Sequence, residues 1–110
     1  SAMHADYIVI FCTVPDAATG SAIAEKLVGE RLAACVNITG AVSSVYTWKG
    51  QVCRESELLL VIKSRRTLFG DIERAIRSVH PYEVPEIIAM PVLEGHAPYL
   101  AWIDGATSPS

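Results

Sequence analysis

Four runs of apolar residues along the chain have the composition of β-strands. Between them, apolar residues recur at helical spacing. Residues 7–14 read YIVIFCTV, a continuous β-branched and aromatic run that is typical of a buried strand. Pro15 ends this run because proline cannot donate to a sheet ladder. Asp16 can then cap a helix over 17–31, in which apolar residues recur at helical spacing on one side.

The next two runs predict an unusually long β-hairpin. Residues 33–48 are rich in Val, Ile, Thr and Tyr, with a bulge or bend expected at Gly40. Lys49-Gly50 is expected to turn the chain into a return strand over 51–64. Strands of about 14 residues would reach about 45 Å, more than a domain of this size covers. The distal part is therefore expected to project and to need support from a partner subunit.

The remaining pattern predicts a second helix over 67–79, a fourth strand over 86–92 and a short final helix over 97–105. His80-Pro81 should end the second helix, because the residue before proline is pushed out of the helical region. The order β-α-β-β-α-β plus a C-terminal helix predicts an α/β protein of the α+β type, with a ferredoxin-like antiparallel sheet. Both main helices should cover one face of that sheet, which leaves the other face bare.

One domain is expected over 6–106, with an expression remnant and disordered N-terminus at 1–5 and a disordered tail at 107–110. The hydrophobic content of 51% is high for so small a monomer, which favours an oligomer. The net charge of −3 is interspersed, so nucleic acid is disfavoured as a partner. No apolar run reaches the roughly 20 residues of a membrane span. Three cysteines, an odd number, favour reduced thiols and a cytoplasmic protein.

Four short segments, taken together in this order and spacing, resemble the CutA family of divalent-cation tolerance proteins. They are FCTVPD at 11–16, LAACVN at 32–37, YTWKG at 46–50 and HPYEVPEI at 80–87. The resemblance runs from about Tyr7 to Trp102. It implies a ferredoxin-like subunit in a tight homotrimer, with an architecture like that of PII signalling proteins. It also implies a link to tolerance of copper and other divalent cations, and no established catalytic activity.

The resemblance further implies candidate metal ligands. The family's proposed copper ligands map onto Cys12 and His80, while Val79 stands where the pattern places a second histidine. Glu86 or Glu83 could add an oxygen ligand, and copper or another divalent cation would be bound without being required for folding. The alternatives are that Cys12 is a small buried hydrophobe and that His80 bonds a carbonyl at the end of its helix.

Four aromatic residues, Tyr46, Trp48, Tyr82 and Trp102, could stack on a ligand but are expected to anchor the trimer interface. The predicted function is that of a homotrimer binding divalent metal ions or small ligands at clefts between subunits. The alternative is a scaffold or signalling trimer that binds protein partners without a metal. A ferredoxin-like hydrolase would need an anion-cradling loop with catalytic Arg and Asn, which the sequence lacks, so no enzyme is expected.

Overall fold

The computed structural model describes residues 6–109, so the predicted expression remnant at 1–5 and the last residue lie outside the described part. The predicted element order is confirmed. The elements are β1 (Tyr7–Val14), α1 (Ala17–Gly29), β2 (Cys35–Trp48), β3 (Gln51–Arg65), the short 3₁₀ helix η2 (Arg66–Leu68), α2 (Phe69–Val79), β4 (Ile88–Pro91) and α3 (Ala97–Ala106).

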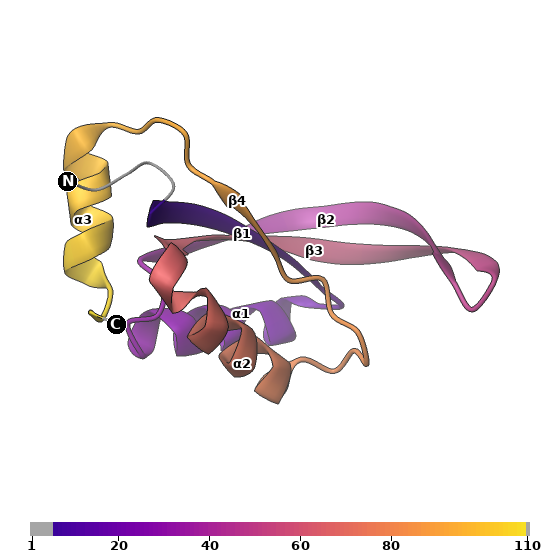
Figure 1. The fold of residues 1–110 in the computed structure, drawn as a ribbon. Helices are drawn as coiled ribbons and strands as arrows, with labels where there is room; N and C mark the ends of the chain where they lie inside the picture. Colours follow the sequence, from indigo (N-terminus) through magenta and orange to yellow (C-terminus); the bar gives the residue numbers. More distant parts are fainter. Residues whose placement is uncertain (1–5, 110) are drawn as a thin grey trace.

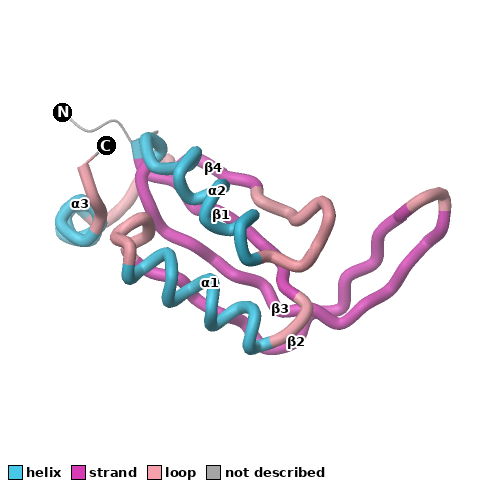
Figure 2. Tube along the Cα trace, turned by 90° about the horizontal axis from the view of Figure 1, so that it is seen from below, coloured by secondary structure: helices cyan, strands magenta, loops and turns pink. Residues whose placement is uncertain are grey.

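The strands form one antiparallel sheet in the order β2-β3-β1-β4, which confirms the ferredoxin-like topology. Helices α1 and α2 lie side by side on one face, while α3 lies at the end remote from the hairpin tip (Figures 1 and 2). Alternate β1 residues point at the helices and are buried: Ile8, Ile10, Cys12 and Val14. They pack with buried side chains of α1, β3 and α2 in the main hydrophobic core.

Helix α3 packs on a second, smaller core and brings the C-terminal segment with it. Tyr7, Ala34 and Ile103 form this core. Thr107 is only 2% exposed; its hydroxyl donates to the Ile103 carbonyl at 2.8 Å and accepts from Arg65 Nε at 2.8 Å. The Ser108 amide donates to the Arg31 carbonyl at 2.8 Å. These hydrogen bonds link the first two residues of the predicted tail, 107–108, to residues distant in sequence.

The hairpin projects from the domain, as the sequence predicts. Its strands have 14 and 15 residues, and the described chain measures 47 × 26 × 24 Å along its principal axes. Strand β1 ends with the pair Val14–Leu58, so the part of β3 before Leu58 pairs with β2 alone. Lys49 and Gly50 have φ of 51° and 78°, the left-handed geometry that a two-residue hairpin turn requires.

The predicted irregularity in β2 is a register shift between Ile38 and Ala41, next to Gly40. Thr39 compensates for the interrupted ladder, since its hydroxyl accepts from the Leu59 amide at 2.9 Å. A bulge of this kind increases local twist and redirects the strand. The distal hairpin therefore leaves the plane of the domain's sheet beyond this point.

Several element boundaries differ from the sequence prediction by one or two residues. Helix α1 is capped by Asp16, which accepts from the Thr19 amide at 2.8 Å, but it ends at Gly29 because Arg31 takes the left-handed region at φ 59°. Helix α2 starts later than expected, after the 3₁₀ turn η2. Strand β4 is shorter than 86–92, because the chain before Ile88 diverges from β1. Among residues 6–109, no helix is both long and apolar enough to cross a membrane.

Substitutions at the two glycines of α1 are expected to affect stability differently. A Cβ at the buried Gly20 would lie 3.3 Å from Val14 Cγ2 and 3.4 Å from Leu60 Cδ2, whereas one at Gly29 would meet nothing within 4 Å. We expect Gly20→Val to lower the free energy of unfolding by about 1–3 kcal/mol through overpacking. The matched Gly29→Val should change it by no more than about 0.5 kcal/mol. Urea unfolding measures both, and equal effects would contradict the close packing of α1 on the sheet.

Tyr7 makes stability depend on pH in the alkaline range. Its hydroxyl donates to Asp104 Oδ2 at 2.6 Å, and this bond, together with burial, raises the pKa of Tyr7 from 10 to about 12. The stabilisation is complete below pH 10 and is lost as the pH rises through 12, because the neutral phenol is the donor. Urea unfolding between pH 9 and 12 should show the advantage of the wild type over Tyr7→Phe shrinking. A constant difference would disprove this role.

Candidate functional site

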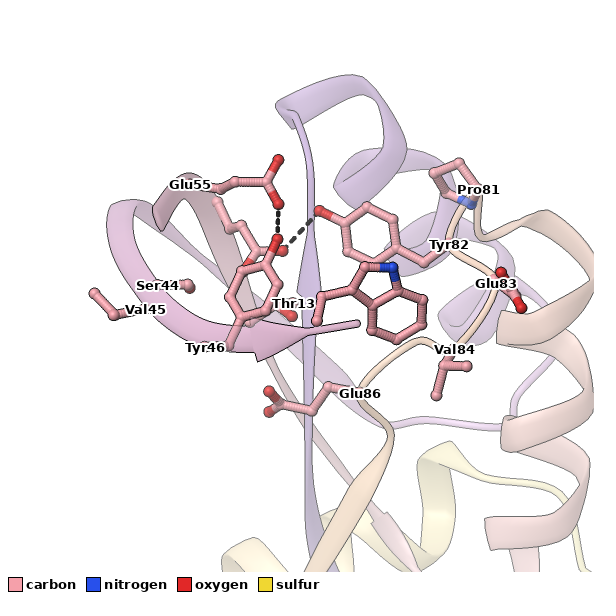
Figure 3. Close-up of a pocket in the computed structure, with 12 residues that line it drawn as sticks. Thr13, Ser44, Val45, Tyr46, Glu55, Pro81, Tyr82, Glu83, Val84 and Glu86 are labelled. Carbon is pink, nitrogen blue, oxygen red and sulfur yellow. Dashed lines mark hydrogen bonds between the residues drawn. The ribbon is translucent and has the colours of Figure 1, made fainter. Parts of the chain in front are cut away.

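A pocket of about 730 Å³ lies where the hairpin extends past the end of β1. Its opposite wall is the segment 81–86, which connects α2 to β4 (Figure 3). The lining residues come from three separate parts of the chain: Thr13 of β1; Ser44, Val45, Tyr46, Trp48, Glu55 and Glu57 of the hairpin; and Pro81, Tyr82, Glu83, Val84 and Glu86.

The hairpin contributes its residues through the period of two along each strand. Ser44 pairs directly with Glu55, and residues two apart on a strand share a face, so Tyr46 and Glu57 lie on the same side as this pair. The hydroxyl of Tyr46 donates to the Glu55 carboxylate, as Figure 3 shows. One face of the distal hairpin thus presents aromatic rings and carboxylates to the pocket.

His80 holds the opposite wall in place. It leaves the helix with ψ of 133°, and its Nδ1 lies 3.1 Å from the amide nitrogen of Tyr82. Since an amide N–H can only donate, Nδ1 is the acceptor, and the proton of the neutral ring is on Nε2. Nε2 then donates to the Thr13 carbonyl at 2.8 Å. The ring therefore ties the segment after α2 to the end of β1.

Tyr82 connects that wall to the hairpin. Its hydroxyl donates to Glu57 Oε2 at 2.7 Å. Burial, and then the hydrogen bond to Glu57, raise the pKa of Tyr82, so the phenol remains a donor throughout the physiological range. The Tyr82 ring also lies 4.7 Å from the His80 ring, centroid to centroid. Pocket shape thus depends on a chain of contacts from Thr13 through His80 and Tyr82 to Glu57.

The pocket carries negative charge without compensation. Four glutamates line it, Glu55, Glu57, Glu83 and Glu86, and no Lys, Arg or His does. The three ion pairs found within residues 6–109 involve none of these four. Glu57 is only 6% exposed, whereas the other three are exposed. Carboxylates gathered in a hollow concentrate cations from solution.

The two residues expected to hold copper are close together but do not fit a metal ion in this arrangement. Cys12 is fully buried, and burial, with the nearby charges of Glu86 and Glu57, raises the pKa of its thiol to about 12. A metal ion would have to reach this buried side chain and displace the thiol proton. His80 uses both ring nitrogens in hydrogen bonds. In the part of the chain that the structure describes, no group of three His, Cys, Asp or Glu could hold a metal ion.

The other predicted site residues lie in two different parts of the structure. Glu86, the expected oxygen ligand, lines the pocket, and so do three of the four predicted interface aromatics, Tyr46, Trp48 and Tyr82. Trp102 instead lies on α3 against Tyr99, with ring centroids 5.4 Å apart. Glu55 and Glu57 also line the pocket, and neither belongs to a motif that marks a site in the sequence. Their spacing of two on a predicted strand, which places both on one face, was the available signal.

Comparisons with known proteins agree with this fold. A family model described as "CutA1 divalent ion tolerance protein" matches residues 8–106. The "Divalent-cation tolerance protein CutA" of Thermus thermophilus is 44% identical over 95 residues, which cover 86% of this chain and 92% of the relative. "Protein CutA" of mouse is 44% identical over 97 residues, 88% of this chain, which spans only 55% of the mouse protein.

Solved structures give the same result in three dimensions. The crystal structure of CutA1 from Oryza sativa superposes with a TM-score of 0.93 at 40% identity, and the match covers 96% of each chain. The family model and the Thermus thermophilus relative are named for tolerance of divalent ions and not as enzymes. The ferredoxin-like topology and the projecting hairpin agree with the family match, which covers nearly all described residues. This chain therefore belongs to the CutA1 family of divalent ion tolerance proteins.

Proposed function

We propose that this protein acts in divalent-cation tolerance as a homotrimer, and that the pocket beside the hairpin is where its metal ion or small ligand binds. The observation that carries the proposal is the lining of four glutamates without a basic side chain. The names of the relatives support the link to divalent cations. In the trimer, a neighbouring subunit would border this pocket and turn it into a cleft between subunits.

The exposed apolar surface of the single chain supports assembly. Val52 on the hairpin is 77% exposed, and on β4 Ile88 and Met90 are each 55% exposed. A two-stranded ribbon of this length is marginally stable alone, and contiguous apolar surface usually marks an interface. We place Tyr46, Trp48, Tyr82 and Trp102 at this interface, in a PII-like trimer. The three free cysteines support a cytoplasmic location.

For the metal, we propose carboxylate ligands instead of the Cys12–His80 pair. Glu83 and Glu86 are exposed and line the pocket, so a cation reaches them without unfolding the core. One subunit does not hold three ligands together, and a neighbouring subunit would have to add the rest. Copper or another divalent cation would bind after folding, because the buried core is built from apolar side chains and does not involve this pocket.

A second candidate function is a scaffold trimer that binds protein partners and no metal. The observation in its favour is the apolar surface exposed outside the hairpin, since Val84 is 66% exposed and Leu93 is 77% exposed. Such residues can serve a partner protein as well as a second copy of the chain. The two functions differ in one measurable property, which is whether the assembled protein binds a cation at the pocket.

Assembly is tested by light scattering after size-exclusion chromatography. We expect a mass of three times 11.9 kDa at micromolar concentration. Val52→Asp should shift the protein towards monomer, because it places a charge in the apolar contact that supports the hairpin. Val28→Asp on α1, a residue 44% exposed on the helix side, is the matched control and should leave the trimer intact. A wild-type monomer would exclude the proposed assembly.

Metal binding is tested by isothermal titration of the reduced trimer with Cu(II) and Zn(II). The double variant Glu83→Gln/Glu86→Gln should weaken binding by about tenfold or more, because each carboxylate attracts the cation with about 1 kcal/mol or more. Cys12→Ala should bind like the wild type, since Cys12 is fully buried and does not line the pocket. Loss of binding in Cys12→Ala alone would instead place the metal at Cys12 and His80. No binding by the wild type would favour the scaffold.

A further inference from the structure

Helix α3 is fixed to the domain by fewer apolar contacts than α2. Of its ten residues, Ile103 is the one that is buried, whereas α2 buries three of its eleven. Ile103 packs with Tyr7 and Ala34 in the small core, which is separate from the main core. Elements with few buried apolar contacts open at a lower free energy than the core does. Polar contacts therefore have to supply much of what holds α3 in place.

Two arginines provide such contacts at the C-terminal end of α3. Arg65, the last residue of β3, donates from Nε to Thr107 Oγ1 at 2.8 Å and from a terminal nitrogen to the Ser108 carbonyl. Arg31, which follows α1, donates to the Gly105 carbonyl at 2.9 Å. Hydrogen bonds from a guanidinium are about twice as strong as those between neutral groups, and positive charge is favourable at a helix C-terminus. The two side chains thus join the end of α3 to β3 and α1.

The backbone of Arg31 serves the same contact. Its φ of 59° lies in the left-handed region, which favours glycine and is unfavourable for arginine. It follows Glu30, the C-cap of α1, at a position where helices usually have glycine. In this conformation its carbonyl accepts from the Ser108 amide at 2.8 Å while its side chain reaches Gly105. The unfavourable conformation is thus compensated by contacts to the C-terminal segment.

Thr107 relays the contact from Arg65 into the helix. It is almost fully buried, and its hydroxyl donates to the Ile103 carbonyl at 2.8 Å while it accepts from Arg65. Arg65 Nε also lies 3.9 Å from Asp104 Oδ1, and Asp104 Oδ2 accepts from Tyr7 at 2.6 Å. Because these contacts share Arg65 and Asp104, the loss of one weakens the others. The segment is therefore expected to be held or released as a unit.

We propose that α3 and residues 107–108 form a C-terminal latch that opens while the sheet, α1 and α2 stay folded, and that Arg65 and Arg31 hold it closed. The latch lies at the end of the domain remote from the hairpin tip (Figure 1), and none of its residues lines the pocket. It carries Trp102, which we place at the subunit interface, so opening withdraws an interface residue in the proposed trimer. That consequence, unlike the latch itself, rests on the proposed function.

Hydrogen–deuterium exchange followed by mass spectrometry tests the latch. In the wild type, the amides of α3 and of Ser108 should have protection factors at least about tenfold lower than those of residues 9–13 in β1. Arg65→Met keeps an unbranched side chain but removes the guanidinium, so it should speed latch exchange by about tenfold or more. The matched control is Arg66→Met, at an exposed neighbour that takes no part in these hydrogen bonds, and it should exchange like the wild type.

A substitution in the main core distinguishes local from global opening. Ile72→Val removes one methylene from a fully buried side chain of α2 and lowers the stability of the whole domain. It should speed exchange in residues 9–13 by about threefold or more. Latch exchange should not change, because the latch opens without unfolding the core. If Ile72→Val speeds both sets equally, α3 opens only with the whole domain and the inference is overturned.

Arg31→Asn is a second variant of the latch. Asparagine accepts the left-handed region but is too short to reach Gly105, so the turn after α1 is kept while the hydrogen bond is lost. Latch exchange should become about threefold faster or more. Unchanged exchange in both Arg65→Met and Arg31→Asn would overturn the role of the two arginines.

Light scattering separates this inference from the proposed function. A wild-type monomer in which α3 still exchanges faster than β1 would keep the latch and exclude the trimer. A trimer in which α3 and β1 exchange together would keep the trimer and exclude the latch. If both stand, Arg65→Met should dissociate on dilution at a higher concentration than Arg66→Met. Equal dissociation of the two would disprove the link between the latch and Trp102.

Discussion

The difference in length between the β2–β3 hairpin and strand β1 is the constraint on which the rest of the structure depends. Strand β1 ends at Val14, while the hairpin continues to the turn at Lys49 and Gly50. Beyond that point the backbone ladder has only two strands, and the helices that cover one face of the sheet do not extend along the ribbon (Figure 1). The same overhang leaves apolar residues such as Val52 exposed and forms one wall of the pocket.

The hairpin forms only one wall of the pocket. A short chain of polar contacts holds the opposite wall, the segment 81–86, in place. His80 fixes the segment after α2 to the Thr13 carbonyl, and Tyr82 reaches from that segment to Glu57. The histidine that the family pattern associates with copper thus has a structural role in this conformation. Its tautomer follows from the direction of two backbone hydrogen bonds, which leaves neither nitrogen free for a metal.

The charge of the pocket sets the requirement for a metal ion. Four carboxylates without a basic neighbour in the lining attract cations. A metal ion also requires several ligands that converge on one point, and a group of three is absent from the described residues of one subunit. A neighbouring subunit would therefore have to complete a metal site.

The sequence alone determined the order of the elements, the projecting hairpin with its turn and bulge, and the family, because these depend on local periodicity, turn chemistry and short motifs. It also singled out Tyr46, Trp48 and Tyr82, which the structure brings to the lining of one pocket. Only the tertiary structure decided that Cys12 faces the core, that both nitrogens of His80 are occupied, and that Glu57 is buried against Tyr82. The physical reason is that burial and hydrogen-bond saturation arise from segments far apart in the sequence, and spacing within one strand or helix does not report them.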